Sequence, residues 1–173
     1  MQIFGQILSI IAMAVSIISF QCHKNRNLYL FQGLSGIFFG ISFILLDSGA
    51  SITTAALFNF VNVLRGFVMM SPRLRHKSLL AAVLVLYTAA AVFTFDGWVT
   101  VLLIAMQYAG TVAMWYNDGK IVRIVQFFII SPTWLFHNIF IIFSIGGICC
   151  ELFNLGSIIV SFFRFRKTGF EKG

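Results

Sequence analysis

Two asparagines stand at matching positions in two apolar segments of this chain. Asn59 lies in the segment 52–70, and Asn154 lies in the segment 148–163, 95 positions later, each directly after a phenylalanine. A carboxamide offers hydrogen-bond donors and acceptors, and a polar group at membrane depth is costly without a partner. The pair therefore predicts a site that holds one small polar ligand. The alternative is that each asparagine bonds a neighbouring helix and only stabilises packing.

Further polar residues share helix faces with these asparagines. Asn62 lies three residues after Asn59, so it is a second candidate for ligand binding on that face. Arg65 lies one more turn along, near the end of its segment, and its side chain is expected to snorkel to the membrane surface. Glu151 lies three residues before Asn154 and is expected to be near the opposite surface, in contact with water.

The segment 124–143 carries the densest group of polar and aromatic residues. Pro132 lacks a backbone donor and disfavours helical geometry in the residue before it, so a hinge is expected there. Trp134 lies deep, away from the segment ends where tryptophans form interfacial belts, and is expected to stack on a ligand. His137 shares the face of Trp134. It is a candidate ligand-binding residue, interpreted either as a bond to another helix or as a proton relay.

Catalytic and metal-binding patterns are missing from the sequence. There is no glycine-rich phosphate loop, no His-Glu-x-x-His, no Gly-x-Ser-x-Gly and no pair of carboxylates within the apolar segments. No second histidine or carboxylate is spaced to complete a metal site with His137. The cysteines are Cys22 and the adjacent Cys149-Cys150, an odd count without metal-type spacing. We therefore expect no enzyme, no cofactor and no metal, and a membrane-embedded enzyme is the weakest alternative.

The composition indicates that a membrane positions these residues. The chain is 60% hydrophobic and 10% charged, whereas a soluble domain carries roughly 25% charged residues. A membrane helix needs about 17–25 apolar residues, and on that basis residues 1–173 are predicted to form one all-α membrane domain with seven spans. The predicted spans are Ile3–Phe20, Leu28–Leu46, Ile52–Met70, Ser78–Phe95, Trp98–Tyr116, Ile124–Phe143 and Ile148–Phe163. In the second span, the spacing Gly33-x-x-Gly36-x-x-x-Gly40 predicts close helix packing.

The net charge of +7 is distributed in a way that indicates topology rather than nucleic-acid binding. All Lys and Arg residues except Arg65 follow spans 1, 3, 5 and 7. The stretches after spans 2, 4 and 6 carry none and include Asp47 and Asp96. The positive-inside rule then predicts an outside N-terminus and a cytoplasmic C-terminus with a basic tail at 164–173. Because no basic region or cleavage site accompanies span 1, it is expected to be a retained helix.

The order of the segments indicates an internal repeat. Gln32 and Gln126 are 94 positions apart, close to the offset of the two asparagines. The predicted plan is 3+1+3: two parallel three-helix repeats, about 3–70 and about 98–163, joined by a linker helix at about 78–95. The linker supplies the inversion that parallel repeats with an odd number of spans require. In transporters built from repeats, the substrate lies near the midplane at the repeat interface.

Several stretches of the sequence resemble one family. They are the run from Phe58 to Arg65, the run from Trp134 to Asn138, Gly146-Gly147 followed by Glu151, and Arg164-Phe165-Arg166. Over nearly the whole chain, the sequence resembles the YgjV-type bacterial inner membrane protein family. The Asn-x-x-Arg and Trp-x-x-His-Asn elements are the more specific parts. The resemblance implies a multi-pass protein of the bacterial inner membrane.

The 3+1+3 plan is more distantly similar to the SWEET proteins, which transport sugars, and to the nicotinamide riboside transporters. In SWEET-type carriers an asparagine in the third helix of each repeat contacts the substrate, and Asn59 and Asn154 match those positions. This sequence departs from the SWEET pattern at the end of the first helix of each repeat, where Phe20-Gln21 and Trp115-Tyr116 replace a Pro-Gln pair. The similarity therefore does not imply a sugar substrate.

Two functional expectations follow. The first is a bacterial inner-membrane transporter of a small polar metabolite, with Pro132 as a hinge and a site at the midplane. Its expected binding residues are Asn59, Asn62, Asn154, Trp134 and His137. The second is a non-transporting receptor or assembly partner with the same fold, in which the buried polar groups only join helices. The expected partners are the lipid bilayer and a small polar metabolite, without nucleic acid, and a homo-oligomer is left open.

Overall fold

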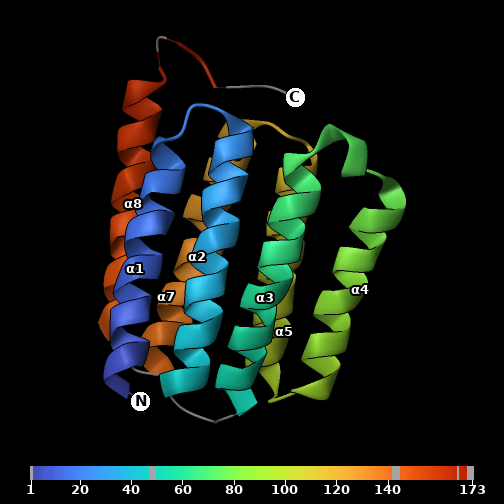
Figure 1. Ribbon diagram of the computed structural model, residues 1–173, viewed down its shortest axis with the longest axis vertical. Coiled ribbons are helices and arrows are strands. Elements are labelled where there is room, and N and C mark those ends of the chain that lie inside the picture. The colour runs from blue at the N-terminus through green and yellow to red at the C-terminus, as the bar shows by residue number, and fades with distance from the viewer. Residues whose placement is uncertain (1, 47–49, 142–144, 167, 171–173) are drawn as a thin grey trace.

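The protein is a bundle of helices that run up and down along one axis (Figure 1). The computed structural model describes residues 2–46, 50–141, 145–166 and 168–170, so Asp47, Lys167 and Lys172 lie outside the described residues. The described ranges hold helices and no strand, which confirms the all-α prediction. The helices are α1 (Gln2–Gln21), α2 (Asn25–Leu46), α3 (Ala50–Met70), the 3₁₀ turn η1 (Pro72–Leu74), α4 (Lys77–Phe93), α5 (Trp98–Trp115), α6 (Gly119–Val125), the π-helical turn η2 (Gln126–Ile130), α7 (Ser131–Phe140) and α8 (Ile145–Arg164).

Within the described ranges, six helical stretches are long and apolar enough to cross a membrane. They are α1, α2, α3, α5, the continuous run from α6 through η2 to α7, and α8; the apolar α4 is shorter, with 17 residues. The run from α6 to α7 begins at Gly119, before the predicted start at Ile124. The difference arises because Asp118 caps the helix, its carboxylate accepting from the backbone N–H of Lys120 at 2.7 Å.

The six long helical stretches form a closed ring. Around it α1 packs on α2, α2 on α3, α3 on α5, α5 on the α6–α7 run, α7 on α8, and α8 on α1. The helix α4 lies outside the ring, against α3 and α5. The N-terminus lies at one end of the bundle, and α1, α3, α5 and α8 all finish at the other end, beside the C-terminus (Figure 1).

A close approach between α2 and α3 fixes part of the ring. A Cβ atom added at Gly36 would lie 2.9 Å from the backbone oxygen of Asn59, and one added at Gly40 would lie 3.0 Å from the Phe60 ring. These contacts confirm the close packing that the glycine spacing of the second span predicts. The backbone of Asn59 is therefore held directly against α2.

Apolar side chains fill the interfaces between helices and also cover the outside of the bundle. The rings of Phe58 and Tyr87 meet edge to face at 5.4 Å, which joins α3 to α4. Large apolar side chains such as Ile3, Val92 and Phe163 are exposed on the outer surface. An apolar outer surface of this extent fits contact with lipid.

Candidate functional site

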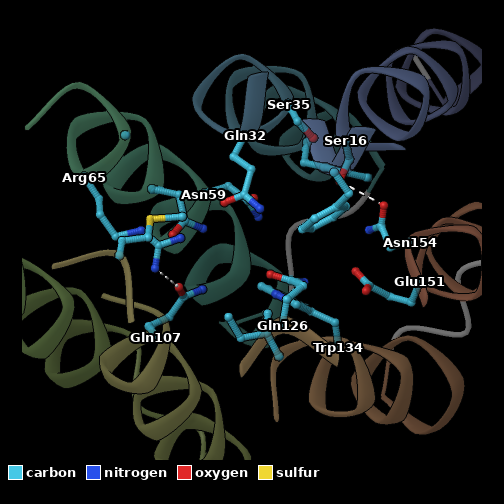
Figure 2. Close-up of a pocket in the computed structure, with 17 residues that line it drawn as sticks. Ser16, Gln32, Ser35, Asn59, Arg65, Gln107, Gln126, Trp134, Glu151 and Asn154 are labelled. Carbon is cyan, nitrogen blue, oxygen red and sulfur yellow. Dashed lines mark hydrogen bonds between the residues drawn. The ribbon is translucent and has the colours of Figure 1, made fainter. Parts of the chain in front are cut away.

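A polar cavity lies inside the ring of six helices. Its volume is about 80 Å³, below the roughly 300–1,000 Å³ of sites for drug-sized ligands, so it fits only a small ligand. Polar side chains from opposite walls converge on it (Figure 2). Its polar lining comprises Ser16, Gln32, Ser35, Asn59, Asn62, Arg65, Gln107, Gln126, Glu151 and Asn154.

Two pairs of residues with matching sequence offsets, Asn59 with Asn154 and Gln32 with Gln126, occupy similar places in their helices and line this one cavity. Asn59 lies nine residues after the start of α3 at Ala50, and Asn154 lies nine residues after the start of α8 at Ile145. Gln32 lies seven residues after the start of α2, and Gln126 lies seven residues after the start of α6. Two pairs of side chains thus reach one cavity from opposite sides of the ring (Figure 2).

The carboxamide of Asn59 presents an acceptor to the cavity. Its Nδ2 donates to the backbone oxygen of Ala55 at 2.8 Å, within α3. A carbonyl oxygen can only accept, so this contact fixes which end of the carboxamide is the nitrogen. Among the described residues, none donates to Oδ1 of Asn59. That oxygen is therefore available to a ligand or to water.

The other two predicted asparagines line the cavity while bonding neighbouring helices. The Oδ1 atom of Asn154 accepts from the hydroxyl of Ser16 at 3.1 Å, which joins α8 to α1 (Figure 2). The Oδ1 atom of Asn62 accepts from the hydroxyl of Tyr87 at 2.6 Å, which joins α3 to α4. Each keeps part of its carboxamide at the cavity wall. Both roles that the sequence offered, helix contact and cavity lining, therefore occur in the same side chains.

The irregularity expected near Pro132 is a π-helical turn just before the proline. The N–H of Ser131 donates to the backbone oxygen of Gln126, five residues back, and the turn spans Gln126–Ile130. The amide of Gln126 also donates to the Ser131 hydroxyl at 3.2 Å. Pro132 itself is exposed on the outside of the ring. Because π-turns interrupt the regular α-helical hydrogen bonds, this is the place in the α6–α7 run where a hinge is most easily accommodated.

A second, smaller cavity lies beside the polar one, and Trp134 lines both. The second cavity has a volume of about 50 Å³ and shares four lining residues with the first, namely Phe39, Asn59, Trp134 and Glu151. The indole stacks on the Phe43 ring at 6.5 Å between centroids, and Phe43 stacks on Phe39 at 6.0 Å. Phe39 and Trp134 line both cavities and Phe43 lines the smaller one, so the stack lies where a passage between the two cavities would run.

His137 lies outside both cavities. Its ring packs edge to face on Trp134, 5.5 Å between centroids, and the side chain is buried. It belongs to the lining of neither cavity. The structure thus places His137 against Trp134 and outside the lining of both cavities.

Arg65 does not snorkel, contrary to the sequence-based interpretation. Only 6% of its surface is exposed, and its Nη1 donates to Oε1 of Gln107 at 3.3 Å and to the hydroxyl of Thr111 at 3.4 Å. The side chain extends toward α5 because Gln107 and Thr111 accept its hydrogen bonds there (Figure 2). Within the described part of the chain, both of its partners are neutral, so the guanidinium charge has no carboxylate next to it.

Glu151 is likewise buried rather than wet. It is 8% exposed, lines both cavities and points toward the axis of the ring (Figure 2). Its Oε2 atom has no hydrogen-bond partner among the described residues. The site therefore contains one acidic and one basic side chain on different walls.

Sequence reasoning missed three polar lining residues, Ser16, Ser35 and Gln107. Ser16 has a detectable signal, because Thr111 lies 95 positions after it, the offset of the two asparagines. Gln107 has no such signal, because Ala12 stands 95 positions before it. No group of three or more His, Cys, Asp or Glu able to hold a metal ion occurs among the described residues.

The fold and the site define a class: a polytopic helical membrane protein with a polar cavity lined by its helices. Within that class, the chain belongs to the Imp-YgjV family of bacterial inner membrane proteins, whose family model matches residues 3–169. This protein is therefore a multi-pass protein of the bacterial inner membrane. No curated protein and no solved structure matches the chain.

Proposed function

We propose that this protein is a carrier for a small polar metabolite, with its binding site in the polar cavity inside the ring. The single observation that supports this most is that two repeat-related pairs, Asn59 with Asn154 and Gln32 with Gln126, line one cavity. Polar side chains that only joined helices would not need a shared cavity. A cavity on the axis of a ring of membrane helices is also where repeat-built transporters hold their substrate.

The packing order supports two parallel repeats. In the ring, α1, α2 and α3 follow one another, and then come α5, the α6–α7 run and α8. A half-turn about the bundle axis exchanges these two sets of three while keeping every neighbour relation. The position of α4 outside the ring fits a linker helix, and its 17 residues would extend about 25 Å as a seventh span.

The charge distribution supports the orientation. Apart from Arg65, the basic residues lie at or after the ends of α1, α3, α5 and α8, which lie together at one end of the bundle (Figure 1). With that end in the cytoplasm, as the positive-inside rule requires, the aromatic stack of Phe39, Phe43 and Trp134 lies on the outer side of the polar cavity. Movement at the π-turn before Pro132 would then open the cavity to one side of the membrane. The metabolite would cross by facilitated diffusion or by ion-coupled exchange.

A carrier is favoured over an enzyme by the chemistry of the lining. The cavity contains one carboxyl group, Glu151, and one guanidinium, Arg65, on different walls, and otherwise carboxamides, hydroxyls and apolar groups. Carboxamides and hydroxyls bind and orient a ligand but are weak proton-transfer groups at neutral pH. The arrangement supports reversible binding.

Efflux from proteoliposomes tests the proposal. Vesicles containing the purified protein are loaded with a defined mixture of small polar metabolites, and the released compounds are quantified by mass spectrometry. At least one compound is expected to leave faster than from protein-free vesicles. The double variant Asn59→Ala, Asn154→Ala is expected to slow that efflux about tenfold or more, since each lost hydrogen bond contributes about 1 kcal/mol or more.

The matched control is Asn27→Ala, which removes an exposed asparagine near the start of α2. This variant should leave efflux unchanged. Equal efflux with and without protein would sink the carrier proposal. An unaffected double variant would sink the assignment of the site.

A non-transporting receptor or assembly partner is the second candidate. It is favoured by the contacts between helices: Asn154 with Ser16, and Asn62 with Tyr87. On this alternative, a ligand would stabilise the purified protein against heat but would not cross the vesicle membrane. The same pair of measurements therefore separates the two candidates.

A further inference from the structure

We propose that the ligand of the polar cavity is a small zwitterion, held with its anionic group toward Arg65 and its cationic group toward Glu151. This rests on the carrier function proposed above and narrows its substrate class. Two features of the cavity wall decide the class of ligand. They are which buried polar atoms lack a hydrogen-bond partner, and whether those atoms are hydrogen-bond donors or acceptors.

The wall formed by α3 and α5 presents donors. Nε of Arg65 and Nε2 of Gln107 are both buried and have no hydrogen-bond partner among the described residues. The orientation of the Gln107 amide is fixed chemically, because its Oε1 accepts from Arg65, which can only donate. The unpaired amide nitrogen and the guanidinium therefore lie side by side (Figure 2). Together they form a subsite for an anion or another strong acceptor.

The part of the cavity nearer the start of α8 presents acceptors. Oε2 of Glu151 is buried without a partner in the described ranges, and Oδ1 of Asn59 faces the cavity with its nitrogen already engaged by Ala55. The indole of Trp134 lines both cavities together with these two residues. An aromatic face also attracts cations. These three groups form a subsite for a cation or another strong donor.

The depths of the two charged residues place these subsites at different levels along the axis. Arg65 lies fifteen residues after the start of α3, and Glu151 lies six residues after the start of α8. Arg65 reaches back toward the middle of the bundle to bond Gln107, nine residues after the start of α5. Arg65 therefore lies nearer the basic end of the bundle than Glu151, with Gln107 and Asn59 at an intermediate depth between them.

The balance of charge selects the ligand class. A buried charge without a partner is strongly unfavourable. An anion alone would satisfy Arg65 and leave Glu151 unpaired, and a cation alone would do the reverse. A neutral polyol would leave both charges unpaired. A zwitterion supplies a counter-charge to each at once, whereas every other class leaves at least one of the two without a counter-charge. Specificity for the zwitterion is this difference in affinity.

The test uses four classes of small ligand with the purified full-length protein in lipid nanodiscs. The zwitterions are alanine, β-alanine and γ-aminobutyrate; the cation is alaninamide, the anion is N-acetylalanine, and the neutral compounds are lactamide and ribose. Thermal stabilisation and dissociation constants are measured for each. We expect at least one zwitterion to bind and the other three classes to bind about tenfold to a hundredfold more weakly, because each leaves a charged hydrogen-bonding group unpaired.

Charge-removing variants give a readout that a purely structural role would not produce. Glu151→Gln should shift the preference toward N-acetylalanine, and Arg65→Gln should shift it toward alaninamide. Asp96→Asn and Arg73→Gln remove exposed charges elsewhere and should leave the preference unchanged. If a variant does not fold, the class preference of the unaltered protein still decides the matter.

Selective binding of a neutral compound, an anion or a cation overturns the zwitterion assignment and leaves the carrier standing. Failure of every zwitterion to bind, with efflux of other metabolites from proteoliposomes, also overturns this assignment alone. Failure of all four classes, together with no efflux above that of empty vesicles, overturns both proposals.

Discussion

Arg123 donates from Nη2 to the backbone oxygen of Phe20 at 3.0 Å, which ties α6 to the end of α1. The same nitrogen donates to the backbone oxygen of Cys22 at 2.8 Å, and Nη1 donates to that of Gly119 at 2.9 Å. The side chain is fully buried, and its guanidinium lies 5.0 Å from the centre of the Phe170 ring. Carbonyl groups at a helix end lack partners within the helix, so Arg123 satisfies that of Phe20 in the last turn of α1 and that of Cys22 just beyond it. Its contact with Phe170 connects this helix end to the C-terminal tail.

The variant Arg123→Lys is expected to destabilise the protein by about 1.5–3 kcal/mol, because an ammonium group cannot reproduce the planar fork that reaches several carbonyls. Thermal unfolding in detergent measures the effect. Arg166→Lys is the matched control, since Arg166 is exposed on the same end of the bundle. Equal melting temperatures for the two variants would contradict the role given to Arg123.

A second prediction concerns the close approach of α2 and α3. In Gly36→Ala the new Cβ would lie 2.9 Å from the backbone oxygen of Asn59, so the helices must separate. We expect a loss of about 1–3 kcal/mol, typical of overpacking, together with weaker ligand binding, because Asn59 moves with its backbone. Gly156→Ala is the control, since a Cβ added there would meet no neighbouring atom within 4 Å. If Gly36→Ala changed neither the stability nor the ligand affinity, this contact would not be what positions Asn59.

The docking of α4 onto the ring gives a third prediction. The Tyr87 hydroxyl donates to Oδ1 of Asn62 at 2.6 Å, and the tyrosine is fully buried. Tyr87→Phe keeps the ring contact with Phe58 and removes only this bond, so the expected destabilisation is about 1 kcal/mol. The exposed Tyr116 provides the control Tyr116→Phe, which should not change the melting temperature. A larger change in ligand affinity than in stability would mean that Tyr87 acts on the site rather than on packing.

The sequence predicts the helices of this protein well because membrane helices require long apolar runs, and such runs are visible in composition alone. It also singles out Asn59, Asn154 and Trp134, since a polar or large aromatic side chain in such a run is unusual. All three line the cavity. The start of α6 is harder to predict, because its first turns carry Lys120 and Arg123 and are recognisable only from the Asp118 cap.

The direction of long side chains could not be predicted. Arg65 lies close enough to the end of α3 to snorkel, yet it turns inward because Gln107 and Thr111 on α5 accept its hydrogen bonds. That outcome depends on α3 packing next to α5, a contact between segments distant in the sequence. His137 shows the converse case. It shares a helix face with Trp134 and its ring packs on that residue, yet only Trp134 lines the cavity.

The last prediction concerns the passage between the two cavities. Cys150 lines the smaller cavity and is fully buried, so it reports on access across the stack that Trp134 forms with Phe43. In a protein with Cys22 and Cys149 replaced by serine, Cys150 should react slowly with a water-soluble thiol reagent.

Adding Trp134→Leu should speed the reaction, because the smaller side chain leaves the passage between the polar cavity and the smaller one open. It should also cost about 3 kcal/mol or somewhat less in stability, since a large buried ring is lost. Trp98→Leu is the control, because Trp98 is exposed at the start of α5. The same labelling rate in both variants would mean that Trp134 does not close the passage, and that another element must move to open the site.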